Sequence, residues 1–354
     1  MQVKLSANLD FLRAVAVLLV LAQHILNRFR IGPMLGISIP PIGVFGVLLF
    51  FVHTCLVLMY SMERSGLDGQ ALAGNFYVRR LFRIYPLSIL AVLTAVALHL
   101  DAVQGIPGLS RAAPVAAGRI VSNLLLMQNL FKTGSIINVL WSLPFEVQMY
   151  IFLPFLFLWI RGKRSAAWRL GLLWMAFVVL ATMRTYWAEH GAPVGLVGRL
   201  LLLEYVPNFL PGVIAFTLVH TPRMKSYLWP PFILILAAAY SILPSSATGW
   251  ALCLLLGLGI PYFAEIKTGW LRAISHQIAT YSYGIYLSHQ FCIWVVSDPL
   301  GSFPLWSRIL LLIVMLIGIP IVLYHAIEKP MIKAGANLAE KWHARPLVAA
   351  VAES

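Results

Sequence analysis

Long apolar segments follow one another along the whole chain, and they restrict its fold more than any other feature. They cover, roughly, residues 9–27, 41–61, 83–101, 139–160, 167–184, 199–220, 227–243, 249–265, 279–297 and 307–328. A helix of about 20 apolar residues crosses the hydrocarbon core of a bilayer. Only 11% of the residues are charged, whereas soluble domains carry about 25%. The pattern predicts an all-α fold, a polytopic membrane helical bundle of about ten transmembrane helices.

The charge of the chain is strongly basic, with 26 Lys and Arg against 12 Asp and Glu. Such an excess in a soluble protein would suggest nucleic acid, but here the basic residues stand in short connections between apolar segments. Most of them fall on one side if the N-terminus is cytoplasmic, which predicts that both termini are cytoplasmic. We therefore expect a multi-pass protein of a bacterial inner membrane that binds no nucleic acid. The three cysteines lie in apolar segments and are expected to pack as small hydrophobic residues.

The first apolar segment carries Arg13 and His24, which are eleven positions apart. In a helix they are separated by roughly 16 Å along the axis and lie on nearly the same face. Charged groups on the face of a membrane helix cost free energy unless they line a polar cavity, so the pair predicts such a cavity. Two other interpretations stay open. Asp10 and Arg13 could form an interfacial ion pair, and His24 alone could be a core histidine.

Two further segments place ionisable groups at apolar positions. Arg79, Arg80 and Arg83 share a helical face at the start of the third segment, where they could bind phosphate or only anchor the helix at the cytoplasmic surface. Glu146 is the only acidic residue between positions 139 and 160. A carboxylate inside a membrane segment needs a cationic or hydrogen-bonding partner, so Glu146 is either a functional group or the structural partner of an arginine such as Arg13.

The last third of the chain adds a polar stripe and a helix end. Ser282, Tyr286 and His289 follow the spacing i, i+4, i+7 and therefore share one face. The run 328–330, Glu-Lys-Pro, is predicted to stop the final helix with an interfacial ion pair. In the longest connection, residues 119–131 are predicted to form a short amphipathic or re-entrant helix.

Taken in order, these motifs resemble the acyltransferase-3 family of membrane-bound O-acyltransferases, which modify surface glycans and other acceptors. The first motif is Leu-Asp-x-Leu-Arg-Ala-x-Ala from position 9, with His24 after it, and the second is Arg-Arg-x-x-Arg-Ile-Tyr-Pro from position 79. The others are Trp-Ser-Leu-x-x-Glu-x-Gln-x-Tyr from position 141 and Ser-Tyr-Gly-x-Tyr-Leu-x-His from position 282, before the Glu-Lys-Pro run. The sequence departs from the family at His53-Thr54, where Ser-Gly is usual, and at Pro144, where a small polar residue is usual.

The resemblance implies an acyltransferase-3-like transmembrane domain over residues 1–334, and the residues after it, 335–354, are predicted from their composition to form a short polar cytoplasmic tail. It implies an acyl-CoA donor, with acetyl-CoA as the default and succinyl as the runner-up, and a glycan or lipid-linked sugar hydroxyl as acceptor. His24 would be the general base, or the transiently acylated group, because a reference pKa of about 6.5 suits proton abstraction near neutrality. Glu146 would orient His24 or balance an arginine, and no metal is implied.

The remaining site residues divide between the two substrates. Arg13, Arg80 and Arg83 are expected to hold the phosphates of the donor by charge-assisted contacts, and Tyr85 is a further donor candidate. The candidates for the acceptor are Asp10, Asn129, Trp141, Tyr150, Ser282, Tyr286 and His289. The alternative function is a transporter for an anionic substrate, because buried Arg, Glu and His also suit a carrier. Against it stand the lack of a visible internal repeat and the gathering of cations at one mouth.

Overall fold

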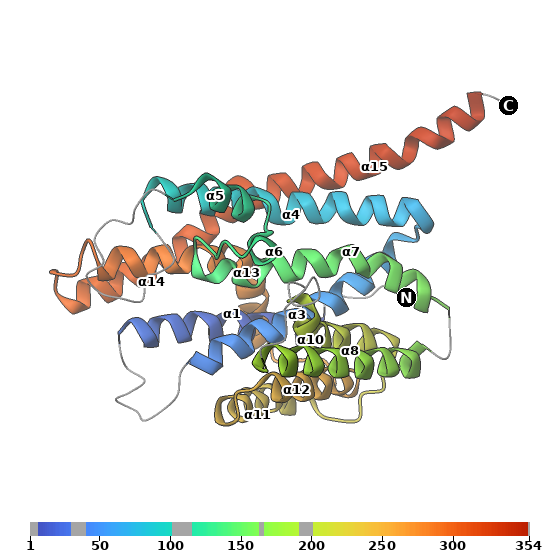
Figure 1. Ribbon diagram of the computed structural model, residues 1–354, viewed down its shortest axis with the longest axis horizontal. Helices are drawn as coiled ribbons and strands as arrows, with labels where there is room; N and C mark the ends of the chain where they lie inside the picture. The colour runs from blue at the N-terminus through green and yellow to red at the C-terminus, as the bar shows by residue number, and fades with distance from the viewer. Residues whose placement is uncertain (1–5, 30–39, 101–114, 163–165, 191–200, 353–354) are drawn as a thin grey trace.

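The computed structural model describes residues 6–29, 40–100, 115–162, 166–190 and 201–352. Within these ranges the secondary structure is helical, apart from an isolated bridge between Met224 and Phe263. The longer helices run side by side along the long axis of the molecule (Figure 1). The prediction of an all-α bundle is confirmed.

The helices follow the predicted apolar segments closely. They are α1 (Ala7–Arg28), α3 (Pro40–Ser65), α4 (Gly69–Ala97), α5 (Ala117–Leu124), α6 (Gln128–Phe131), η1 (Asn138–Trp141), α7 (Leu143–Ile160), α8 (Ala166–Glu189), α10 (Leu202–Thr217), η2 (Ser226–Leu228), α11 (Trp229–Ile242), α12 (Ser246–Gly259), η3 (Ile260–Tyr262), α13 (Gly269–Ser297), α14 (Leu305–Leu323), the π-helical turn η4 (Tyr324–Glu328) and α15 (Lys329–Ala352). Among the described residues, each predicted segment falls mainly on one of these helices or on two consecutive ones. Helices α4 and α13 begin well before the segments predicted at 83 and 279.

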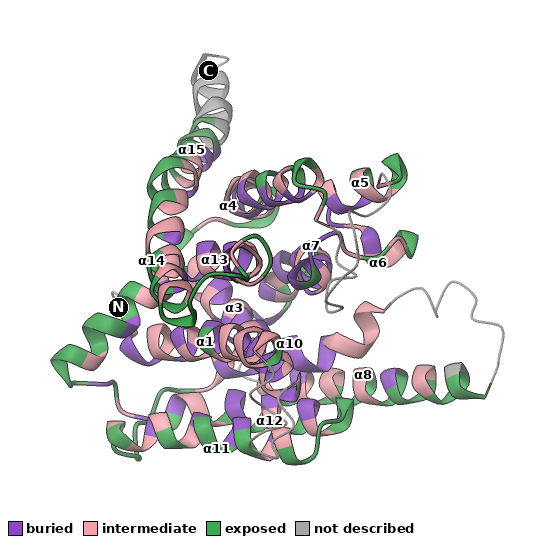
Figure 2. Cartoon of the chain, turned by 90° about the vertical axis from the view of Figure 1, so that its left-hand side faces the viewer, coloured by how far each residue is buried: buried purple, intermediate pink, exposed green. Residues whose placement is uncertain are grey.

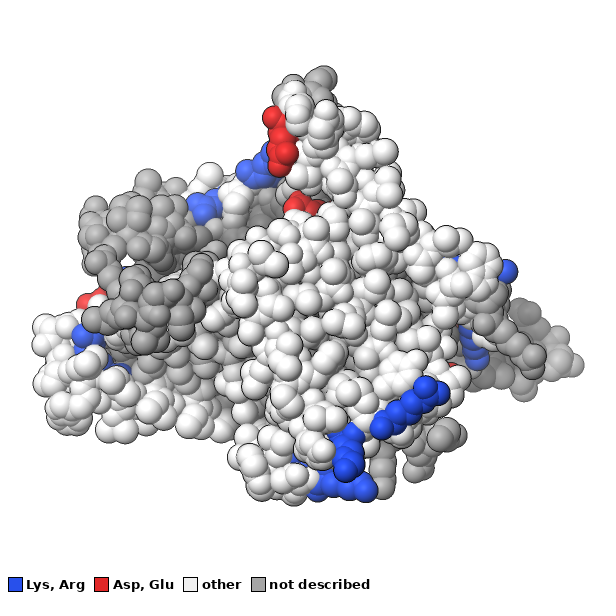
Figure 3. All heavy atoms as spheres, turned by 90° about the horizontal axis from the view of Figure 1, so that it is seen from below, with Lys and Arg blue, Asp and Glu red and all other residues white. Residues whose placement is uncertain are grey.

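In the described part of the chain, six helical stretches are long and apolar enough to cross a membrane, and two shorter apolar helices accompany them. The face seen from below in Figure 3 carries few acidic or basic side chains, as expected of a surface in contact with lipid. The chain is therefore an integral membrane protein. The number of crossings and the cytoplasmic position of the termini stay predictions.

Helix α3 lies at the centre of the bundle, and α1 packs between α3 and α13 (Figure 2). Two glycines allow the backbones to approach closely. A Cβ atom at Gly46 would lie 2.6 Å from the Ala16 carbonyl oxygen, and one at Gly212 would lie 2.1 Å from the Val52 carbonyl oxygen. Small residues at such crossings are the usual means of packing membrane helices. The position of α1 therefore depends on Gly46.

The long connection forms two short helices, α5 and α6, within the range predicted for one. The Asn123 side chain donates to the Gly134 carbonyl and accepts from the Ile136 backbone N–H, which ties α5 to the segment after α6. The prediction of a short helix here is confirmed in part, because the chain turns between 124 and 128.

The predicted helix stop at 328–330 is wrong. The π-helical turn η4 joins α14 directly to α15, and Pro330 is the second residue of α15. A proline cannot form the i→i−4 hydrogen bond of an α-helix, and the wider π-helical turn before it accommodates that loss. Helix α15 continues beyond position 334 and packs on α4, with Gly335 against Phe82 and Ala339 fully buried. The segment predicted as a polar tail is thus helical as far as Ala352. Its cytoplasmic position stays a prediction.

Candidate active site

The interface between α1 and α13 joins the polar residues that both sequence patterns singled out. The Arg13 Nε donates to the Ser282 hydroxyl at 2.7 Å. The imidazole rings of His24 and His289 meet edge to face, with 5.0 Å between their centroids. Arg13 and His24 therefore lie on the same face of α1, and that face meets the Ser282–His289 side of α13. Arg13 contacts Ser282, and His24, further along α1, contacts His289, further along α13. The two helices therefore run parallel here.

His24 is held in a defined tautomer by its own helix. Its Nδ1 lies 2.9 Å from the Val20 carbonyl oxygen, and because a carbonyl oxygen only accepts, Nδ1 must carry the proton. The neutral ring then has a lone pair on Nε2, and no described residue forms a hydrogen bond to that atom. The His24 residue is half-buried. The arrangement presents a free basic nitrogen inside the bundle.

A cluster of charged side chains surrounds Arg13. The cluster comprises Arg13, Arg80, Arg83, Glu146 and Glu328. Arg83 of α4 forms an ion pair with Glu328 of η4, whose side chain has no exposed surface. Arg13 interacts electrostatically with both Glu328 and Glu146. The Arg83 guanidinium also lies 5.8 Å from the ring centroid of Tyr283, whose hydroxyl donates to the Ile84 carbonyl. Residues of α1, α4, α7, α13 and η4 therefore meet at this cluster.

Glu146 of α7 is the second carboxylate of the cluster. It accepts a hydrogen bond from the Tyr150 hydroxyl one turn further along α7, and it interacts electrostatically with Arg13 and Arg80. Arg80 forms no hydrogen bond or ion pair with any described residue. Three arginines thus stand beside two carboxylates, so the cluster retains an excess positive charge when all five groups are ionised.

Tyr286 connects α13 to the start of α7. Its hydroxyl lies 2.7 Å from the Ser142 hydroxyl and donates to the Val139 carbonyl at 2.6 Å. Its ring centroid is 6.3 Å from that of His289. The three residues of the predicted stripe are all buried. Tyr286 therefore fixes the position of the 3₁₀ turn η1 relative to the two histidines.

Other predicted site residues lie outside this cluster. Asp10 pairs with His276 at 2.9 Å and not with Arg13. The Tyr85 hydroxyl donates to the Leu125 carbonyl and joins α4 to the end of α5. Two acceptor candidates lie near the start of α7: Asn129 forms reciprocal amide hydrogen bonds with Gln148, and Trp141 packs against Phe145 and Tyr205.

Sequence reasoning missed several members of the cluster. Glu328 was assigned to an interfacial pair, but it is buried and bound to Arg83. His53 was noted in the sequence as a departure from the family that could face the cavity, and it is buried within electrostatic range of Arg13. Tyr283, which was not singled out, lies under Arg83. Ser142 bonds to Tyr286. The signals were present, since each residue stands inside or beside a motif, but only the fold brings them together.

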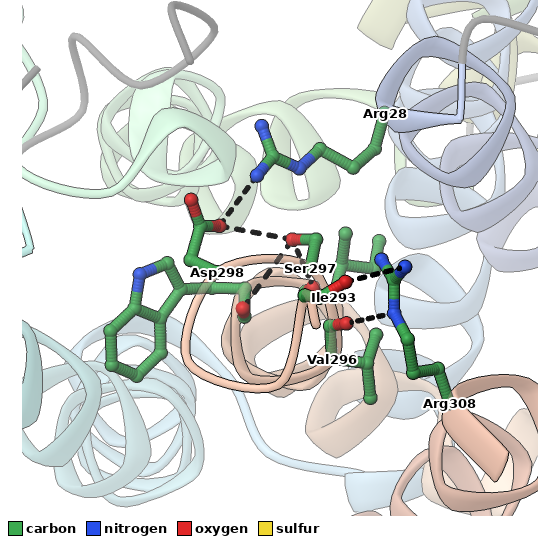
Figure 4. A network of polar contacts seen from close by, with 8 residues as sticks. Arg28, Ile293, Val296, Ser297, Asp298 and Arg308 are labelled. Atoms are coloured by element: carbon green, nitrogen blue, oxygen red, sulfur yellow. Dashed lines mark hydrogen bonds and ion pairs between the residues drawn. The ribbon is translucent and has the colours of Figure 1, made fainter. Parts of the chain in front are cut away.

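A second polar network lies one turn beyond His24, at the other end of α1 (Figure 4). Arg28 pairs with Asp298 at 2.6 Å, and Asp298 also accepts from the Ser297 hydroxyl at 3.0 Å. Arg308 of α14 donates from Nε to the Val296 carbonyl at 2.6 Å. This network ties together the ends of α1 and α13 and the start of α14. The His24–His289 pair therefore lies between two polar regions.

Groups of three or more metal-ligating side chains are absent from the described residues. The available chemistry is that of a neutral imidazole with a free ring nitrogen and of a cationic cluster roughly 16 Å from it along the same face of α1. These features define an integral membrane protein with an ionisable site inside its helical bundle.

Comparison with protein families shows to which family the chain belongs. A family profile described as an acyltransferase domain, that of the acyltransferase-3 family, matches residues 6–325, nearly the whole chain. The chain belongs to this family, and the resemblance given by the motifs is confirmed. Searches of curated proteins and of solved structures found no match.

Proposed function

We propose that this protein transfers an acyl group, acetyl by default, from acyl-CoA to a hydroxyl group of a glycan or lipid-linked sugar in a bacterial inner membrane. Family membership establishes acyl transfer at a membrane. The observation that carries the finer proposal is the Nε2 lone pair of His24, held free by the Nδ1 bond to Val20 on the same helix face as Arg13.

The donor is assigned to the arginine cluster. Its nucleotide end carries several phosphate charges, which suit guanidinium groups that bind two oxygens at once. Arg80 can bind a phosphate without breaking a hydrogen bond or ion pair to a described residue, and the cluster carries a net positive charge when all its groups are ionised. An arm bound there would reach toward His24, because roughly 16 Å of helix separates Arg13 from His24. Tyr85 stays a proposed donor residue, although its hydroxyl is engaged by Leu125.

The chemical step is assigned to His24 as general base. The acceptor O–H bond breaks as its proton moves to Nε2, and the acceptor oxygen forms a bond to the thioester carbonyl carbon. When the C–S bond breaks, the proton passes from His24 to the sulfur, and free thiol and ester are released. Direct acylation of His24 is the alternative route. In this proposal Glu146 compensates part of the positive charge of Arg13 and Arg80.

The acceptor is assigned to the other side of His24. Tyr286 and Trp141 lie near η1, and half-exposed polar groups continue beyond His24 at Arg28 and Asp298. Polyhydroxylated acceptors suit such a surface of aromatic and hydrogen-bonding side chains. Family membership favours this acyltransferase over the carrier for an anionic substrate.

The first test replaces His24 by Ala in purified protein supplied with acetyl-CoA and candidate acceptors. We expect thiol release to fall to background, because the base is lost while Nδ1 contributes only one local hydrogen bond to folding. His220, an exposed histidine after α10, provides the matched control, and His220→Ala should retain wild-type release. Full activity of the His24 variant would exclude His24 as the base. Donor-independent uptake of an anion into vesicles would favour the carrier.

A further inference from the structure

His289 is a buried histidine of α13 with an unsatisfied ring nitrogen. Only 1% of the surface of His289 is accessible to solvent. Its Nδ1 lies 3.0 Å from the Ile285 carbonyl oxygen and therefore carries the proton. Nε2 is then an acceptor, and it is buried with no hydrogen-bond partner among the described residues. A buried acceptor without a hydrogen bond destabilises the folded state by its lost hydration, so a functional role can explain why it is kept.

The surroundings of this nitrogen limit the possible donors. The Tyr286 hydroxyl, which is near in sequence, already donates to the Val139 carbonyl. The closest ring is that of His24, edge to face at 5.0 Å. Neutral His24 has no proton to offer to His289, because its single N–H is bonded to Val20. Protonated His24 has a second N–H, and rotation about the soft χ2 torsion of either ring can turn it toward His289.

We propose that His289 is a positioning residue for His24, and that its Nε2 accepts a hydrogen bond from His24 only while His24 carries the proton taken from the acceptor. This inference rests on the proposed function and adds a second imidazole to it. His289 neither gains nor loses a proton during the reaction. The proton leaves the acceptor oxygen, resides on Nε2 of His24, and passes to the thiolate sulfur as the thiol is released.

The physical reason is the cost of a charged ring inside a lipid-sealed bundle. A hydrogen bond in which the donor is ionised is about twice as strong as a neutral one. An acceptor that is unpaired in the resting state and paired in the charged state lowers the energy of the charged state selectively. Such differential stabilisation raises kcat without strengthening donor binding.

The experiment compares His289→Leu with His289→Gln in purified protein, measuring kcat and the donor KM by thiol release. Leu removes the acceptor atom, whereas Gln keeps an acceptor oxygen near the position of Nε2 but does not titrate. We expect kcat of the Leu variant to fall roughly ten- to hundredfold. The Gln variant should retain kcat within about threefold of the wild type, and the donor KM should stay within about twofold in both.

The matched control is Cys292→Ala, which alters a buried side chain three residues further along α13, in the core beside Ile25 and Phe29. It should leave kcat unchanged. If the Leu variant does not fold, His289→Met replaces it, because Met adapts to irregular cores.

Three results would overturn the inference: equal losses of kcat in the Leu and Gln variants, no loss in the Leu variant, or a loss confined to the donor KM. In each case kcat and the donor KM of the variant are compared with those of active wild-type protein. Wild-type protein that releases no thiol with any donor and acceptor would contradict the proposed function, which separates that failure from this one.

Discussion

Arg80 and Arg83 stand one turn apart on α4 and yet meet different electrostatic surroundings. Arg83 compensates Glu328, whose side chain has no contact with solvent. Arg80 interacts at longer range with Glu146 and has no described hydrogen-bond partner. A buried ion pair is weak evidence of stabilisation, but removing one member leaves the other charge uncompensated. The same residue type should therefore support folding at one position and substrate binding at the other.

Arg83→Leu should lower the free energy of unfolding by roughly 3–5 kcal/mol, because it leaves the Glu328 carboxylate buried without its partner. Thermal unfolding of the detergent-solubilised protein measures the loss. The double variant Arg83→Leu with Glu328→Leu should recover part of it, since both charges are then absent. An Arg83 variant as stable as the wild type would show that the ion pair does not hold η4 against α4.

Arg80→Leu should instead change the donor KM. Because no described ion pair is broken, we expect the unfolding temperature to stay close to that of the wild type. The donor KM should rise by roughly tenfold or more, since a charge-assisted contact to phosphate contributes about 1.5–3 kcal/mol. Steady-state kinetics with acetyl-CoA provide the measurement. A lower unfolding temperature with an unchanged KM would reverse the assignment of the two arginines.

The sequence predicts which residues share a helix face in this site better than it predicts which residues of other helices they contact. Helical rotation alone places Arg13 with His24, and the i, i+4, i+7 spacing groups Ser282, Tyr286 and His289; the structure has both sets in one interface. The pairing of Arg83 with Glu328 joins residues 245 positions apart. Periodicity carries no information over that distance, and the Lys-Pro dipeptide after Glu328 is typical of a helix end.

At the scale of the elements, the α1–α3 crossing decides where Arg13 and His24 stand. Ala16, between these two residues on α1, presents its carbonyl oxygen to Gly46 of α3. Any side chain at position 46 must push the helices apart. The same displacement would move α1 relative to α13, against which its polar face lies.

Gly46→Val should therefore lower both stability and activity. Overpacking at a tight contact costs about 1–3 kcal/mol, and the altered α1 position should reduce kcat even in protein that remains folded. Gly171→Ala on α8 is the control, because no atom lies within 4 Å of a Cβ there; it should keep wild-type kcat and unfolding temperature or raise the latter. Thermal unfolding and thiol release test both variants. Equal behaviour of the two would mean that the crossing is not tightly packed.

The boundaries of the elements show where sequence patterns stop being informative. Helix α4 begins at Gly69, capped by the Asp68 side chain, whereas the apolar pattern begins at 83. Its first part is polar and basic, so hydropathy describes it as a connection. At the other end of the chain, Pro330 is a strong helix-stop signal, yet a π-helical turn carries the chain through it. Hydropathy finds apolar surface, and helix ends depend on caps and packing.

At the scale of the whole molecule, the polar features are distributed unequally along the bundle. Arg13 lies about two turns from the start of α1 (Ala7), which is the end of the helix nearer the predicted cytoplasmic surface. Arg28 and Asp298 lie at the opposite end of α1. The proposed donor site thus lies nearer the start of α1, and the proposed acceptor site lies nearer its end.

This arrangement predicts that the donor acts from one side of the membrane only. Acetyl-CoA carries several charges and does not cross a bilayer unaided, so sealed vesicles distinguish the two mouths. Inside-out vesicles, which expose the face predicted to be cytoplasmic, should release thiol when acetyl-CoA and acceptor are supplied outside and inside respectively. Right-side-out vesicles should remain inactive toward external donor until they are permeabilised. A protease-cleavable tag on either terminus should be cut only in the inside-out preparation.

The donor site and both termini are predicted to lie on the same side of the membrane, so donor use and tag cleavage must change together when the vesicles are inverted. Activity toward external donor in vesicles whose tags are protected would place the arginine cluster and the termini on opposite sides, and the route from Arg13 to His24 would then have to run in the reverse direction.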